Sequence, residues 1–161
     1  MYEAKNKEFL KILLSIDGSE SSIKAAGYAI AMARKKGEND NAELIALYVI
    51  HSEIKHVSST SYGGSVNEKS INEIIEHARK EAGTWFDKVQ EEADENKVKL
   101  RREVIVNSDS IVGAVVDYAE REGVDLIVIG SRGLSGFKKL LLGSTASGVI
   151  TYAHCPVLVV K

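Results

Sequence analysis

The 161-residue sequence lacks several features that would place it in a specialised class. It has one cysteine, Cys155, and one proline, Pro156, so it cannot form an intramolecular disulfide and does not contain Pro-rich or collagen-like segments. No run of about 18 apolar residues is present, and residues 1–11 (MYEAKNKEFLK) lack the apolar core of a signal peptide. We therefore expect a cytoplasmic protein in a reducing environment.

The sequence also lacks an excess of one charge and an obvious catalytic or metal motif. It has 21 Lys and Arg against 23 Asp and Glu, which argues against binding nucleic acid or anionic membranes through bulk charge. The four histidines lack the spacing of metal ligands, and no Ser-His-Asp or Cys-His arrangement can be recognised: His51, His56, His77 and His154. With 44% hydrophobic residues, the chain can bury the core of one domain spanning residues 1–161.

Short apolar runs alternate with longer stretches of helical periodicity. We predict strands at 9–16, 44–50, 98–106, 125–129 and 157–160, and helices at 20–36, 68–96, 109–123 and 144–153. The irregular stretch 51–67 is predicted to be a loop. This alternation indicates an α/β fold, an open doubly wound parallel sheet with helices on both faces. In the helix at 68–96, we expect Ile71, Ile74, Trp85 and Phe86 to lie on the buried face.

The segment from Gly130 to Thr145 follows a buried strand and enters a helix, with the pattern G-x2-G-x9-G-S-T. In open α/β sheets, ligands bind at this position. Gly130 and Gly133 would let the backbone turn tightly and approach a ligand without a Cβ in the way. At Gly143-Ser144-Thr145, the first N–H groups of the next helix would be free to bind an anion. The segment therefore predicts a site for an anion such as a polyphosphate.

Two common phosphate-binding motifs do not match this segment. G-x-G-x-x-G requires glycine where Arg132 stands, and G-x-x-x-x-G-K-[ST] occurs nowhere in the chain. Taken alone, three glycines in a loop are weak evidence for a ligand site and are better explained by turn and helix-cap chemistry.

The spaced glycines resemble the nucleotide-binding motif G-x2-G-x9-G-[ST] of the universal stress protein family, in its ATP-binding branch. The resemblance covers nearly the whole chain and includes residues 14–20, 47–50, 123–131 and 155–160. It implies a Rossmann-like, five-stranded parallel sheet of order 3-2-1-4-5, similar to that of adenine nucleotide alpha hydrolases. ATP would then lie across the crevice between the first and fourth strands.

The resemblance also implies roles for individual residues. Asp17 would bind a ribose hydroxyl or the Mg²⁺ or Mn²⁺ that accompanies the nucleotide, although it could instead only initiate the Asp-Gly-Ser turn. The main chain of Val49 would read the adenine edge, Ser15 would lie against the base, and Ile129 would lie beside the nucleotide. The phosphate and ribose shell would consist of Gly130, Ser131, Arg132, Gly133, Gly143, Ser144 and Thr145. Arg132 could either steer the polyphosphate or lie in solvent.

The function implied by the resemblance is an ATP-binding stress-response protein with a regulatory or sensing role. Hydrolysis should be slow at most, because the chain lacks the P-loop lysine and an evident general base, and no catalytic residue is assigned. One alternative is a nucleotidyl-transferring or ATP-hydrolysing enzyme, which usually has its phosphate loop after the first strand, where this chain has residues 17–20 (DGSE). Another is a nucleotide-free interaction module of the same family, but members of that branch lose the glycine motif.

The last predicted strand suggests self-association. Residues 157–160 (VLVV) carry no charge before Lys161, and in the 3-2-1-4-5 order they form a sheet edge that is open to pairing. The resemblance implies a homodimer in which this strand lies antiparallel to its copy.

Overall fold

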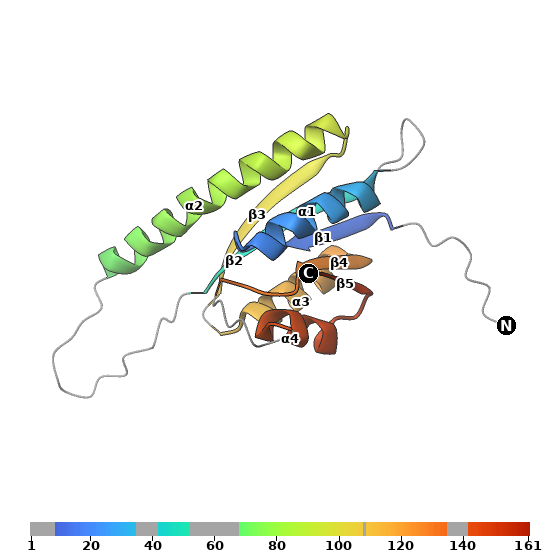
Figure 1. The fold of residues 1–161 in the computed structure, drawn as a ribbon. Coiled ribbons are helices and arrows are strands. Elements are labelled where there is room, and N and C mark those ends of the chain that lie inside the picture. Colours follow the sequence, from blue (N-terminus) through green and yellow to red (C-terminus); the bar gives the residue numbers. More distant parts are fainter. Residues whose placement is uncertain (1–8, 35–41, 52–67, 108, 135–141) are drawn as a thin grey trace.

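The computed structural model describes residues 9–34, 42–51, 68–107, 109–134 and 142–161 (Figure 1). Most of the predicted loop at 51–67 lies outside the described residues. The elements are β1 (Lys11–Ser15), α1 (Glu20–Ala33), β2 (Glu43–His51), α2 (Glu68–Glu95), β3 (Leu100–Asn107), α3 (Ile111–Glu122), β4 (Leu126–Gly130), α4 (Ser144–Tyr152) and β5 (Val157–Val160). Among the described helices, none has the length and apolar character needed to cross a bilayer.

The five strands form one parallel sheet in the order β3-β2-β1-β4-β5. This confirms the predicted α/β fold and strand order. Strands β3 and β5 form the two edges, as predicted, and β1 lies in the centre next to β4. The carboxyl ends of β1 and β4 therefore meet at the same edge of the sheet.

Helices cover both faces of the sheet because successive residues of a buried strand point to opposite sides. In β1, Ile12 and Leu14 pack into one core with α1 and α2, whereas Leu13 packs into a second core with α3 and α4. All three side chains are fully buried. The nearly continuous apolar sequence of the central strands follows from this two-sided burial. Figure 1 shows the two helix layers on opposite sides of the strands.

The turn between β1 and α1 is closed by the single tryptophan of the chain. Gly18 has a φ of +80°, and a Cβ added there would lie 2.3 Å from the indole of Trp85. Tyr48 meets the same indole edge-on, with ring centroids 5.3 Å apart. Trp85 thus packs against the apolar core, as predicted, but it is only partly buried and also covers this turn.

The prediction that Ile74 is buried is wrong, because this side chain is 64% exposed. Helix α2 has 28 residues and is about 42 Å long at about 1.5 Å per residue. The nine residues of β2 span only about 30 Å. The first half of α2 therefore extends past the sheet (Figure 1), and within residues 71–95 full burial begins at Ala82.

Charged side chains connect the amino ends of strands β1, β2 and β3 with the carboxyl end of α3. Arg101 on β3 donates to Glu122 and to the Tyr118 hydroxyl, and its guanidinium lies 3.5 Å from Glu43. Lys11 on β1 donates to the main-chain carbonyl of Glu122 at 3.0 Å. The hydrogen bond from Arg101 lowers the pKa of the Glu122 carboxyl, because it favours the ionised form.

We predict that Gly18→Ala lowers the free energy of unfolding by about 2 to 4 kcal/mol, because alanine disfavours positive φ and its methyl group would overlap Trp85. Gly83→Ala is the matched control. Gly83 lies in α2 with no atom near its added Cβ, so this change should stabilise the protein by about 0.5 to 1 kcal/mol. Urea unfolding followed by circular dichroism measures both, and equal effects of the two changes would contradict this account of the turn.

We also predict a pH-dependent contribution from Glu122. Because its pKa is lowered in the folded state, ionised Glu122 stabilises the fold above its ordinary pKa, and this stabilisation is lost as the pH falls through the folded value. The free energy of unfolding should therefore be higher in the wild type than in Glu122→Gln at about pH 7, and the difference should shrink towards zero at about pH 3. A difference that is independent of pH, measured by urea unfolding at both values, would argue against this ionic role.

Candidate functional site

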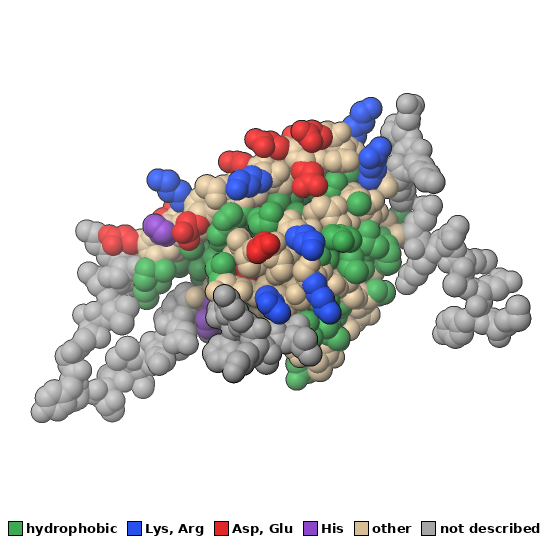
Figure 2. Space-filling model, viewed as in Figure 1, with side chains coloured by type: hydrophobic (Ala, Val, Ile, Leu, Met, Phe, Trp, Pro, Cys, Tyr) green, Lys and Arg blue, Asp and Glu red, His purple; other side chains and the backbone are tan. Residues whose placement is uncertain are grey.

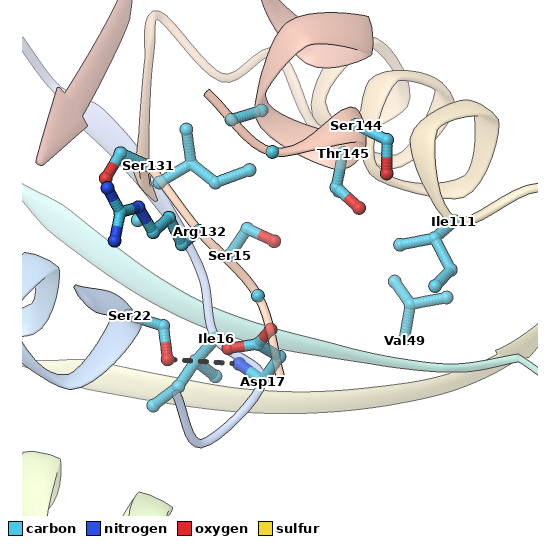
Figure 3. Close-up of a pocket in the computed structure, with 15 residues that line it drawn as sticks. Ser15, Ile16, Asp17, Ser22, Val49, Ile111, Ser131, Arg132, Ser144 and Thr145 are labelled. Atoms are coloured by element: carbon cyan, nitrogen blue, oxygen red, sulfur yellow. Dashed lines mark hydrogen bonds between the residues drawn. The ribbon is translucent and has the colours of Figure 1, made fainter. Parts of the chain in front are cut away.

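A pocket opens where the carboxyl ends of β1 and β4 meet. It is lined by every residue that the sequence analysis singled out: Ser15, Asp17, Val49, Ile129, Gly130, Ser131, Arg132, Gly133, Gly143, Ser144 and Thr145. The two halves of the G-x2-G-x9-G-S-T segment therefore lie against the same space as the end of β1. Figure 3 shows these side chains around the opening.

The pocket exists because the chain leaves the two neighbouring strands in opposite directions. After β1 it enters α1 on one face of the sheet, and after β4 it leads to α4 on the other face, which leaves a crevice between the strand ends. Gly130 is needed here for packing. A Cβ at this position would lie 2.5 Å from the Ser21 hydroxyl and 2.7 Å from the Ser22 nitrogen. The side of Gly130 where a Cβ would stand therefore faces α1, and the missing side chain allows this close packing rather than the approach of a ligand.

Hydrogen bonds fix the segment 131–133 as one wall of the pocket. The Ser131 N–H donates to the Val160 carbonyl at the end of β5 at 2.7 Å. The Arg132 carbonyl accepts from the hydroxyls of Ser19 at 3.1 Å and Ser21 at 2.6 Å. The wall is thus held by β5 on one side and by the start of α1 on the other.

The amino end of α4 adjoins this wall. The Gly143 N–H donates to the Ser131 carbonyl at 2.7 Å, so the expectation that this amide is free to bind an anion is wrong. The next three N–H groups, of Ser144, Thr145 and Ala146, find no acceptor among the described residues, and Gly143 provides no side-chain cap. These unpaired amides at a helix amino end carry partial positive charge and favour an anion.

Asp17 both shapes the turn and lines the pocket. Its Oδ1 accepts from the Ser19 N–H at 3.0 Å and from the Ser19 hydroxyl at 2.6 Å, so the turn-forming role considered from the sequence is present. Its Oδ2 lies 3.0 Å from where a Gly133 Cβ would stand. The carboxylate therefore has one oxygen held by the turn and the other directed across the pocket towards the wall.

Val49 closes the apolar side of the pocket, together with Ile129 and Ile111 (Figure 3). The Ile16 N–H donates to the Leu47 carbonyl, and alternate residues of a strand direct their peptide groups to the same neighbour. The N–H and C=O of Val49 therefore point past the end of β1, where no described residue pairs with them.

The pKa of Tyr48, the residue before Val49, is shifted by burial and also by the carboxylate of Asp17. Burial raises the pKa of the Tyr48 phenol, and the carboxylates of Glu81 and Asp17 raise it further, because negative charges disfavour a phenolate. Tyr48 therefore stays neutral at physiological pH and serves as packing against Trp85.

Four lining residues were not predicted: Ile16, Ser22, Ile111 and Ala146. Ser22 and Ala146 lie in the first turns of α1 and α4. Because helix starts after β1 and β4 face the same crevice, their position in the chain could have indicated them. Ile111 opens α3, which follows the distant strand β3, and nothing in its neighbouring sequence indicates the pocket.

Two expectations from the sequence concern the charge of Arg132 and the binding of a metal ion. The Arg132 side chain is exposed and points away from Ser144 and Thr145 in Figure 3, so its main chain forms the wall while its charge lies elsewhere. Within the part of the chain that the structure describes, no three His, Cys, Asp or Glu side chains gather to hold a metal ion.

Comparisons with known proteins agree with this fold. The family model for the universal stress protein family matches residues 8–161. Universal stress protein MJ0531 of Methanocaldococcus jannaschii is 37% identical over 153 residues, covering 95% of this chain and 82% of the relative. Universal stress protein YxiE of Bacillus subtilis is 35% identical over 153 residues, covering 95% and 99%. The solved structure of MJ0577, also from M. jannaschii, matches with a TM-score of 0.77 at 31% identity, covering 96% of each chain.

More distant solved structures share the fold and contain adenine nucleotides. One universal stress protein is in complex with cAMP at a TM-score of 0.62 and 22% identity. Another, from Archaeoglobus fulgidus, is bound to dAMP at a TM-score of 0.62 and 19% identity. A family member from Arabidopsis thaliana is bound to AMP at a TM-score of 0.63 and 15% identity. Since the family model spans almost the whole sequence and relatives above 30% identity cover nearly all of it, the chain belongs to the universal stress protein family.

Proposed function

We propose that the pocket binds an adenine nucleotide, with its phosphate groups at the amino end of α4. The observation that carries the proposal is the set of N–H groups of Ser144, Thr145 and Ala146, which have no acceptor among the described residues and lie beside a wall that protein hydrogen bonds already hold in place. Such an arrangement binds anions without reorganisation. The nucleotide complexes of the distant relatives support the choice of ligand.

The base would lie at the other end of the pocket. The free N–H and C=O of Val49 form a donor and acceptor pair of the kind that recognises the edge of adenine, while Ser15 and Ile129 flank the same space. The pocket has a volume of about 100 Å³, which is too small for a whole nucleotide. The base and ribose would therefore lie along the open side, next to Val49 and Ile111.

Asp17 is suited to bind either a ribose hydroxyl or a divalent cation, through the oxygen that the turn leaves available. No cluster of ligating side chains surrounds it among the described residues. Mg²⁺ commonly binds through one or two carboxylates, with phosphate oxygens and water completing its shell. Mg²⁺ or Mn²⁺ would therefore enter together with a nucleotide triphosphate and would not reside in the protein alone.

The side chains that line the pocket favour nucleotide binding over rapid nucleotide hydrolysis. Among the described residues that line the pocket, Asp17 is the single carboxylate, and no lysine or histidine is present. Half of the Asp17 carboxylate is engaged by Ser19, which leaves no second group to orient an attacking water. We therefore propose an ATP-binding member of the family with a regulatory role in the stress response, in which nucleotide occupancy shifts a conformational population.

Proline at position 144 tests the role of the main-chain amides. Ser144 is the first residue of α4, where proline fits, and Gly143 has φ −71° and ψ 157°, which are compatible with a following proline. Ser144→Pro should fold but lack one amide that contacts phosphate, whereas Ser144→Ala retains this amide and loses only the hydroxyl. We predict that Ser144→Pro weakens AMP and ATP binding by about tenfold or more relative to Ser144→Ala.

Isothermal titration calorimetry measures these affinities, and circular dichroism confirms that both variants are folded. If the wild type binds neither nucleotide, the proposed function is wrong. If Ser144→Pro and Ser144→Ala bind equally well, the nucleotide is held elsewhere and the assignment of the phosphate site is wrong.

We also propose a homodimer that forms through β5. This strand is an edge of the sheet, and its first three residues are only partly buried. Residues 156 and 160 accept hydrogen bonds from Ile127 and Ser131, so the alternation of the ladder turns the N–H groups of Val157 and Val159 outwards. A second β5 could pair with this edge in the antiparallel direction.

Val159→Pro removes one outward N–H and leaves the bonds to β4 in place, a substitution that edge strands tolerate. We predict a dimer at micromolar concentration for the wild type and for the control Val159→Ala, and a folded monomer for Val159→Pro. Size-exclusion chromatography with light scattering measures the mass. A monomeric wild type or a dimeric Val159→Pro would refute pairing through this strand.

A further inference from the structure

A second cavity lies on the other side of the wall formed by residues 131–133. It is a groove of about 440 Å³ between the start of α1, this wall and the end of β5. Ser131, Arg132 and Gly133 line both cavities, whereas the groove alone is lined by Lys24 and Lys161. The groove and the pocket are therefore neighbours that share a wall but present different side chains.

The groove is positively charged although the protein as a whole has a net charge of −2. Its lining has three cationic side chains, Lys24, Arg132 and Lys161, against one carboxylate, Glu20. In Figure 2, Lys and Arg side chains gather near the centre of the visible face, around the place where Figure 1 marks the C-terminus. This local excess of positive charge would attract an anion.

These cations are not engaged in structural ion pairs. Arg101 and Arg102, on β3, both contact carboxylates at 2.8 Å or less. By contrast, none of the three groove cations forms an ion pair with a carboxylate of the described residues. Their charges therefore remain available to a ligand.

The Arg132 side chain points away from the nucleotide pocket, as Figure 3 shows relative to Ser144 and Thr145. Its carbonyl is held by the hydroxyls of Ser19 and Ser21, and its N–H donates to Ser21 at 3.3 Å. The backbone of Arg132 is thus fixed beside the groove that this residue lines, and its side chain is exposed. A planar guanidinium with five N–H donors matches phosphate oxygens in a bidentate manner.

We propose that this groove binds a small oligophosphate anion of the pyrophosphate class, separately from the nucleotide in the pocket. The two ammonium groups and the guanidinium offer charge to several phosphate oxygens at once, and the first turn of α1 adds a favourable dipole. The volume of about 440 Å³ exceeds what a single phosphate group fills, and two linked groups offer oxygens to more than one of the three cations. The proposal does not depend on nucleotide binding in the other pocket.

The test uses inorganic pyrophosphate as the probe at constant ionic strength, with amide chemical shifts recorded by NMR on the full chain. We expect saturable shifts in residues 19–24 and at Lys161, with residues 144–146 unchanged once AMP has been added. Lys24→Gln and Lys161→Gln should each weaken pyrophosphate binding by about tenfold, while leaving AMP affinity unaltered.

Lys88→Gln is the matched control, because Lys88 is an exposed lysine on α2 that does not line the groove and its loss changes the net charge equally. Unaltered pyrophosphate affinity in Lys88→Gln supports the groove. The proposal would be overturned if pyrophosphate did not bind, or if it shifted only residues 144–146. It would also be overturned if Lys88→Gln weakened pyrophosphate binding as much as the groove variants, or if citrate bound as tightly as pyrophosphate. Failure of AMP to bind would count only against the nucleotide proposal, because the groove is located by its own shifts.

Discussion

The clamp on the short segment after β4 is the constraint on which the site depends. Ser131 is tied through its N–H to the end of β5 and through its carbonyl to Gly143, while the carbonyl of the next residue is held by the hydroxyls of Ser19 and Ser21 at the start of α1. Four main-chain and side-chain groups, from the end of β5 and the starts of α1 and α4, thus converge on two residues. Because this segment cannot move independently, the helix amino end bonded to it is positioned without any ligand.

This clamp explains why a pocket built mostly from main-chain groups can be selective. The amides of α4 and the peptide group of Val49 line the same pocket, and their positions are set by the sheet and by helix packing. Under the proposed function, selectivity for an adenine nucleotide would come from the fixed arrangement of these main-chain groups.

Much of the fold could be predicted from the sequence, because its features are local. The two-sided apolar strands and the alternation of strands with helices are readable within windows of ten to twenty residues. The order of the strands in the sheet was predicted correctly, but from the family resemblance and not from any local pattern. Ile74 illustrates the limit of periodicity: it lies on the apolar face of α2, but the helix outruns the sheet, and this depends on the length of another element.

The sequence by itself determined that the ends of two neighbouring strands and the starts of the helices that follow them meet at one edge, whereas the individual site residues came from the family resemblance and Ile111 was not indicated at all. The tertiary structure alone decided what each of them does there. Gly130 serves the packing of α1, the Gly143 amide is taken by Ser131, and the exposed Arg132 side chain points away from Ser144 and Thr145 (Figure 3). The physical reason is that a hydrogen-bond partner or a close neighbour is supplied by elements far away in the chain, and only their packing brings them within reach.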